Sequence, residues 1–100
     1  MDSASVIAAL KRHEAELRDL GIERLSLFGS VARAEADEDS DIDLAAVLTE
    51  GPRGFDYLER KDRIRDRLQE ILGRPVDLIE EPSSRPRVQR GIEKDRVLAF

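Results

Sequence analysis

Residues 27–33 read Leu-Phe-Gly-Ser-Val-Ala-Arg, and residues 39–44 read Asp-Ser-Asp-Ile-Asp-Leu. The first stretch ends a short apolar segment, 24–28, that predicts a strand, and its Gly-Ser pair predicts the turn that follows. The second stretch leads into the apolar segment 42–48, which predicts another strand. Strands interrupted by a tight turn and an acidic loop indicate a sheet that carries polar side chains at one end.

Working outward from these strands, hydrophobic spacing predicts the remaining elements. They are a helix capped by Ser3 or Ser5 and ended by Gly21, a helical turn over 31–34, a helix over 55–72 ended by Gly73, a strand over 76–79 and a last helix over 86–98. The long helix shows one apolar stripe, formed by Phe55, Leu58, Ile64, Leu68, Ile71 and Leu72. The predicted fold class is therefore α/β, with a mixed β-sheet packed with helices in one small domain over residues 1–100.

Composition excludes several classes of protein. Hydrophobic residues make up 40% of the 100 residues, which is too many for a disordered chain. No stretch approaches the ~20 apolar residues of a membrane span, and residues 1–10 lack a secretory signal, so we expect no membrane association. Cysteine is absent, which excludes disulfides and fits a cytoplasmic location. The single histidine, His13, excludes a catalytic triad and a histidine zinc site, and we expect it on the surface.

Charge is distributed unevenly along the chain. The first fifty residues carry twelve acids and five bases, and the last fifty carry ten acids and twelve bases. No base occurs among residues 34–49, where the acids are Glu35, Asp37, Glu38, Asp39, Asp41 and Asp43. Such a run repels nucleic-acid phosphates, and four aromatic residues are too few for a base-stacking platform. We therefore expect no direct binding of duplex nucleic acid.

Bases gather instead on the last predicted helix. They are Arg85, Arg87, Arg90, Lys94 and Arg96. A solvated helix face is the simpler interpretation of this cluster. A docking surface for an acidic partner is the alternative.

Asp41 and Asp43 are the strongest indication of chemistry. Residues two apart in a strand point to the same face, so both carboxylates would lie together while Ile42 and Leu44 face the core. Two like charges ~4 Å apart repel by about 4 kcal/mol at an effective dielectric near 20. Hard oxygen ligands of this kind suit Mg²⁺ or Mn²⁺. A solvated acidic strand edge is the alternative interpretation.

Two further features strengthen the case for a site. Gly29 permits close approach of the backbone to a ligand, and the Ser30 hydroxyl beside free N–H groups suits a phosphate; an ordinary turn with a serine cap is the alternative. Asp77 places a carboxylate inside an apolar strand, where an unpaired charge is costly. Its alternative roles are a strand-edge residue or an ion-pair partner of Arg74.

Taken together, these motifs resemble the nucleotidyltransferase superfamily that includes DNA polymerase beta, and most closely its minimal, single-domain members. The resemblance covers residues 24–80 and includes the stretch 72–78, Leu-Gly-Arg-Pro-Val-Asp-Leu. It implies a nucleotidyltransferase-like core. The family often has a basic residue where this chain has Val31 and a glycine where it has Ala34, which implies weaker nucleotide binding and a constrained bend.

The resemblance also implies an activity: Mg²⁺-dependent transfer of a nucleoside monophosphate, with AMP from ATP expected, to a hydroxyl. By this resemblance, Asp41 and Asp43 would bridge two Mg²⁺ ions, with Mn²⁺ as a substitute. Asp77 would bind the metal at the attacking oxygen and help to activate that oxygen. The triphosphate would be held by Gly29, Ser30 and Arg33. Two metals ~3.5–4 Å apart can stabilise both the attacking and the leaving oxygens of an in-line displacement.

The resemblance further implies a partner protein. Minimal members of the family are often antitoxins that inactivate a HEPN-domain RNase toxin, by binding it or by attaching AMP to a tyrosine hydroxyl. A catalytically weak binding module is one alternative. A small-molecule nucleotidyltransferase of the antibiotic-modifying kind is the other, although those enzymes usually carry an extra helical domain.

Overall fold

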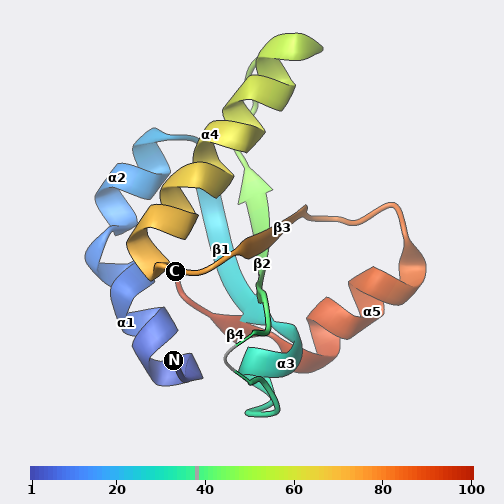
Figure 1. The fold of residues 1–100 in the computed structure, drawn as a ribbon. Helices are drawn as coiled ribbons and strands as arrows, with labels where there is room; N and C mark the ends of the chain where they lie inside the picture. Colours follow the sequence, from blue (N-terminus) through green and yellow to red (C-terminus); the bar gives the residue numbers. More distant parts are fainter. Residues whose placement is uncertain (38) are drawn as a thin grey trace.

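The sheet combines antiparallel and parallel pairing, with strand order β3-β2-β1-β4 (Figure 1). β1 (Ile22–Phe28) pairs antiparallel with β2 (Ile42–Leu48) and with β4 (Val97–Leu98), whereas β2 pairs parallel with β3 (Val76–Glu80). The computed structural model describes residues 1–37 and 39–100, so Glu38 of the acidic run lies outside the described residues. The predicted α/β class with a mixed sheet is confirmed.

Three helices build the main core against one face of this sheet. They are α1 (Ser3–Arg12), α2 (Glu14–Asp19) and α4 (Phe55–Leu72), which Figure 1 shows grouped together. Their buried side chains join those of the strands in one cluster, which includes Val6, Leu10, Leu17, Leu25, Leu27, Leu44, Ile64 and Leu68. α3 (Gly29–Ala32) and α5 (Pro86–Asp95) lie apart from these three helices, and Ile92 of α5 is buried outside the main cluster. Within residues 1–37 and 39–100, no helix is both long and apolar enough to cross a bilayer.

α4 has the predicted bounds but not the predicted burial. Gly73 ends the helix in the left-handed conformation (φ +67°), and its N–H donates to the Gln69 carbonyl over 2.7 Å. Phe55 and Leu58 are 86% and 53% exposed, so their assignment to the core stripe is wrong. The first turns of α4 project beyond the sheet, where no strand lies beneath them (Figure 1).

The first predicted helix is two helices, interrupted at His13. His13 Nδ1 lies 2.9 Å from the Ala9 carbonyl oxygen, and the ring is half-buried at the junction. The cap is Asp2, whose carboxylate accepts a hydrogen bond from the Ser5 N–H over 2.8 Å. The prediction of Ser3 or Ser5 as cap is therefore wrong, because Ser3 is already the first helical residue.

The C-terminal segment differs most from the prediction. The helix predicted over 86–98 ends at Asp95, and residues 97–98 form β4 opposite Ser26 and Leu27. Arg96, predicted on a solvated face, donates to Ser26 Oγ and to Glu81 Oε2, both over 2.9 Å. This ion pair lowers the pKa of the buried Glu81 carboxyl, mainly through the hydrogen bond from Arg96. Two residues of strand pairing are too short a signal to separate from the end of a helix.

Candidate active site

Asp43 and Asp77 lie side by side because β2 and β3 run parallel. They are register partners, each the second residue of its strand. Neighbouring strands lie ≈ 4.7–4.9 Å apart and register partners share a face, so the two carboxylates emerge together. Asp41, immediately before β2, is exposed and is close enough to Asp43 to affect its ionisation. The structure therefore gathers the three predicted carboxylates at one end of the sheet.

The backbone of Gly29 passes close to the Asp43 carboxylate. β1 ends at Phe28, which is the register partner of Asp43, so the next residue turns directly past this carboxylate. A Cβ placed on Gly29 would lie 2.1 Å from Asp43 Oδ2, and the backbone has φ +76°. Both the close approach and the left-handed conformation require glycine. The Gly-Ser pair, predicted as a turn before a helical turn over 31–34, instead forms the first two residues of α3, and Gly29 packs against an acid.

The surroundings of Asp43 disfavour its ionised form. Burial raises the pKa of the Asp43 carboxyl above its usual value, and the neighbouring charges of Asp77 and Asp41 raise it further. The Arg33 guanidinium acts in the opposite direction. A carboxylate in this position favours any positive charge that can replace its lost solvent.

A cleft of about 450 Å³ opens in front of these acids. Five of the six predicted site residues line it, and they are Gly29, Ser30, Arg33, Asp43 and Asp77. Asp41 borders the group without lining the cleft. The sequence thus predicted the floor of the cleft.

The opposite wall of the cleft was not predicted from the sequence. This wall consists of Ile79 at the end of β3 and of residues in or next to α5, namely Arg85, Val88, Gly91 and Asp95. Ile79 could have been found, because it lies two residues after Asp77 on the same face of a predicted strand. The return of α5 across the sheet has no counterpart in local sequence.

Arg33 is already engaged in ion pairs. Its Nη1 lies 2.6 Å from Asp95 Oδ2 and its Nε lies 3.1 Å from Glu35 Oε2. The Asp95 side chain is only 10% exposed, so this pair connects α3 with the end of α5 across the cleft. A ligand that binds Arg33 meets a guanidinium that is oriented by two carboxylates.

Arg74 has a different role from the one considered for it. It donates to the backbone carbonyls of Asp37 (3.1 Å) and Ser40, and so holds the acidic loop next to the start of β2. No ion pair joins it to Asp77 in the described structure. Ala34, where the resembled family often has glycine, adopts φ +59°, so the bend forms despite the Cβ.

The donor set suits a hard divalent cation whose remaining ligands come from a substrate. Asp43 is held by Gly29, lies beside Asp77 and has lost part of its solvent. The described residues contain no group of three acidic or imidazole side chains that would form a metal cage unaided. Mg²⁺ is commonly bound by one or two carboxylates together with substrate phosphates, and these residues fit that pattern.

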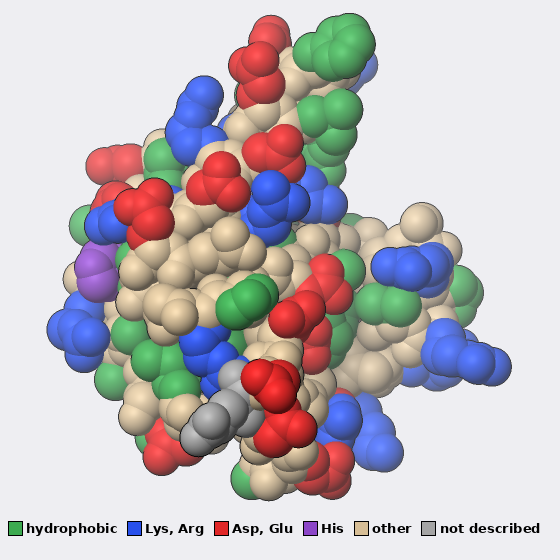
Figure 2. All heavy atoms as spheres, in the orientation of Figure 1, with side chains coloured by type: hydrophobic (Ala, Val, Ile, Leu, Met, Phe, Trp, Pro, Cys, Tyr) green, Lys and Arg blue, Asp and Glu red, His purple; other side chains and the backbone are tan. Residues whose placement is uncertain are grey.

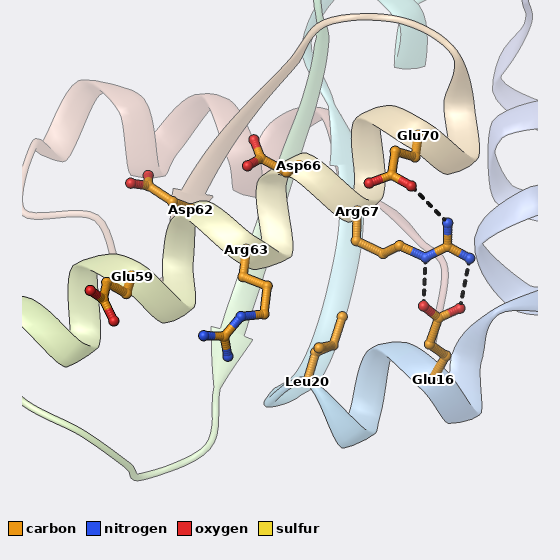
Figure 3. A pocket seen from close by; sticks show the side chains of 8 residues that line it. All are labelled: Glu16, Leu20, Glu59, Asp62, Arg63, Asp66, Arg67 and Glu70. Carbon is orange, nitrogen blue, oxygen red and sulfur yellow. Dashed lines mark hydrogen bonds and ion pairs between the residues drawn. The ribbon is translucent and has the colours of Figure 1, made fainter.

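A second hollow, between α2 and α4, has a volume of about 550 Å³ and is also rich in charge. Figure 3 shows Arg67 between Glu16 and Glu70, at distances of 3.0 Å and 3.4 Å from its two Nη atoms. The hydrogen bond from Arg67 lowers the pKa of Glu16. Arg67 pairs with two of the acids in this hollow, and the neighbouring Arg65 pairs with Asp62 and Asp66. Charges on these exposed helices give no indication of a ligand by themselves.

Carboxylates on adjacent strands, a glycine turn against them and a cation beside them are typical of α/β enzymes that transfer phosphorus-containing groups. Similarity to known proteins identifies the family within this class of enzymes. A model of the nucleotidyltransferase domain family matches residues 10–99. The chain belongs to this family and is a nucleotidyltransferase.

Among curated relatives, protein adenylyltransferase MntA of Thermococcus cleftensis is 32% identical over 89 residues, covering 88% of this chain and 86% of that protein. Protein MJ1379 of Methanocaldococcus jannaschii, provisionally named a protein adenylyltransferase, is 38% identical over 92 residues, or 88% of each chain. A solved structure provisionally described as a minimal nucleotidyltransferase has a TM-score of 0.77 at 32% identity, covering 97% of this chain and 95% of that chain.

A more distant structure, of a tri-AMPylated Shewanella oneidensis HEPN toxin in complex with its MNT antitoxin, shares the fold. Its TM-score is 0.64 at 18% identity, and the match covers 94% of this chain and 71% of that chain. The predicted resemblance to minimal nucleotidyltransferases is confirmed.

Proposed function

We propose that this chain transfers AMP from ATP, with Mg²⁺, to a hydroxyl of a partner protein, and that the partner is a HEPN-domain toxin. The observation that carries the proposal is the packing of Gly29 against Asp43 with Asp77 in register beside it. Relatives named protein adenylyltransferases support AMP and a protein acceptor. The fold neighbour in complex with a tri-AMPylated HEPN toxin supports the partner.

In the proposed reaction the acceptor oxygen attacks the α-phosphorus of ATP. One P–O bond forms to the acceptor, the P–O bond to pyrophosphate breaks, and the hydroxyl proton passes to a carboxylate. Asp77 lines the cleft in register with Asp43, and in this proposal it would hold the metal at the attacking oxygen and help to activate that oxygen. Mg²⁺, when bound, neutralises charge on the phosphate oxygens.

The remaining residues hold and orient the substrate. Asp41 and Asp43 supply the negative charge that retains the metal. The Gly29 backbone approaches the triphosphate without a Cβ in the way, and the Ser30 hydroxyl and the Arg33 guanidinium contact phosphate oxygens. Positioning of the reacting atoms and charge stabilisation account for most catalysis of phosphoryl transfer.

Neutralisation of the toxin by binding alone is a second candidate. The observation in its favour is Arg33, whose guanidinium is occupied by Asp95 and Glu35. A site whose cation is engaged within the chain binds a triphosphate less tightly than a site with a free cation.

Intact mass spectrometry tests the two candidates. The chain is incubated with ATP, Mg²⁺ and a HEPN-domain protein, and the RNase activity of that protein is measured in the same sample. We expect the HEPN protein to gain one or more AMP units and to lose RNase activity. The Asp41→Asn chain and a reaction with EDTA serve as controls. Loss of RNase activity without a mass increase would reject transfer and establish neutralisation by binding.

A further inference from the structure

A hollow of about 420 Å³ lies beside the active-site cleft, between the start of α4 and the segment that leads into α5. We call it the α4–α5 groove. Tyr57 and Lys61 of α4 and Ser84 of the connecting segment line it. Ile79 and Arg85 line both this groove and the cleft. The two hollows therefore adjoin, separated by these two side chains.

Positive charge predominates among the free groups of this groove. Its one carboxylate, Glu80, accepts a hydrogen bond from the Tyr57 hydroxyl. Lys61 and Arg85 form no ion pair within the described part of the chain. Exposed Arg87 and Arg90 extend the charge along α5, and Figure 2 shows this basic region on the side of the molecule where α5 protrudes. A protein of net charge −5 thus has a local positive surface next to its active site.

Exposed apolar side chains lie on the same first turns of α4 as Tyr57, which lines the α4–α5 groove. Phe55 and Leu58 are exposed on the projecting turns of α4, where Figure 2 shows hydrophobic atoms at the surface. Large exposed apolar groups beside polar ones are characteristic of protein-binding surfaces. Nucleic acid matches these apolar side chains poorly, and the acidic run near the cleft repels its phosphates.

From these contacts we infer that the α4–α5 groove binds the segment of the partner protein that presents the acceptor hydroxyl, and that this segment is acidic with an apolar anchor. The inference rests on the proposed function, because it places the acceptor on a protein. Acidic side chains of the segment would meet Lys61 and Arg85, while its apolar side chain would cover Phe55 and Leu58.

Binding of two synthetic peptides, measured by fluorescence anisotropy without nucleotide, tests the inference. Each peptide has a central tyrosine and flanking leucines, and one carries glutamates where the other carries lysines. We expect wild-type chain to bind the acidic peptide about tenfold more tightly than the basic one. The net negative charge of the chain predicts tighter binding of the basic peptide. The order of the two affinities therefore distinguishes recognition by the groove from attraction to the overall charge.

Lys61→Glu and Lys11→Glu form a matched pair of variants, since both reverse one lysine and Lys11 lies on the remote helix α1. We expect Lys61→Glu to remove the preference for the acidic peptide and Lys11→Glu to retain it within about twofold. Leu58→Ser should weaken both peptides equally, and thermal melting confirms that each variant is folded.

Three results would overturn the inference: preference for the basic peptide, equal effects of the two lysine variants, or tighter binding of a single-stranded RNA of similar length. Failure of AMP transfer is scored separately by mass spectrometry. Binding of the acidic peptide without any AMP transfer would reject the proposed function but would still support the α4–α5 groove as a peptide-binding site.

Discussion

The cleft at Asp43 and the hollow between α2 and α4 both carry many charges, but they hold them in opposite ways. The α2–α4 hollow is larger, about 550 Å³ against 450 Å³. Acids outnumber bases in its lining, but these charges lie on the helices α2 and α4, where Arg67 joins Glu16 to Glu70. In the cleft, backbone geometry holds like charges together, and burial raises the pKa of Asp43.

This difference shows what distinguishes a candidate site from a charged surface. Opposite charges on exposed helices reach one another by side-chain rotation and add little to stability. In the cleft, by contrast, strand register places Asp43 beside Asp77, and Gly29 packs against Asp43, so side-chain rotation separates these like charges less easily. A forced repulsion that a ligand can relieve is therefore better evidence of function than volume or charge count.

Neutralising single acids at the cleft and in the α2–α4 hollow should give the largest difference in AMP transfer rate. On the proposed mechanism we expect Asp41→Asn and Asp43→Asn each to reduce AMP transfer at least about a thousandfold, because they remove charge that would retain the metal. Asp62→Asn and Asp66→Asn in the α2–α4 hollow should change the rate less than about twofold. Initial rates with labelled ATP measure both pairs, and near wild-type transfer by both cleft variants would sink the enzyme mechanism.

Glycine substitutions test whether geometry holds the charges together. Gly29→Ala places a methyl group 2.1 Å from Asp43 Oδ2 at φ +76°, so we expect transfer to fall about a hundredfold and stability to fall by about 1–3 kcal/mol. Gly73→Ala is the control, since Gly73 has φ +67° but nothing within 4 Å. It should lose only about 1 kcal/mol and keep its activity. Equal losses of activity would assign the effect to backbone strain alone.

Substitution of Asp77 distinguishes a role in the chemical step from a role in nucleotide binding. If Asp77 helps to activate the attacking oxygen, Asp77→Asn should keep measurable nucleotide binding while transfer collapses. Because Asp77 is exposed, its melting temperature should hardly change. A nucleotide titration beside a thermal melt decides the matter, and joint loss of binding and stability would indicate a structural role instead.

Removing the repulsion should stabilise the chain without metal. Asp43 has a raised pKa in the folded state, so its charged form opposes folding. We expect Asp43→Asn to be as stable as wild type or more so at pH 7, by ~0.5–2 kcal/mol. The gain should disappear as pH falls below the ordinary aspartate pKa of about 3.9, where wild type is protonated in both states.

Denaturant melts across this pH range measure the effect of Asp43→Asn. Magnesium with nucleotide should then raise the wild-type melting temperature more than that of the variant, at matched ionic strength. A variant that is less stable at every pH would contradict a forced repulsion.

The smallest effect is expected from the paired hollow. Arg67→Gln removes the ion pairs with Glu16 and Glu70, which lie on exposed helices. We expect the melting temperature to shift by less than about 4 °C, with AMP transfer unchanged. The shift should shrink further in high salt. A large salt-independent loss would show that this hollow is organised more tightly than its exposure suggests.

The floor of the cleft could be predicted because it depends on local sequence. Alternation in strands placed Asp41 and Asp43 together, and a carboxylate in an otherwise apolar strand singled out Asp77. The bounds of α4 followed from hydrophobic spacing and from Gly73. Each of these features is encoded within a few residues of the position that it predicts.

Features that depend on tertiary structure were missed. α5 forms the far wall of the cleft, and Arg96 leaves the predicted solvated face to pair with Glu81, because the chain returns across the sheet. Phe55 was assigned to the core because hydrophobic periodicity does not reveal that α4 is longer than the sheet beneath it. The roles of the site residues toward metal and nucleotide remain predictions.

If Arg33 binds the triphosphate as proposed, its ion pair with Asp95 makes nucleotide binding an exchange rather than an addition. A triphosphate that takes over the Arg33 guanidinium must displace Asp95, whose side chain is 10% exposed and would be left with little solvent. The affinity for nucleotide then reflects the difference between two anions competing for one cation. On this proposal, removing the carboxylate of Asp95 should tighten nucleotide binding at Arg33, so Asp95 would set the nucleotide concentration at which the site fills.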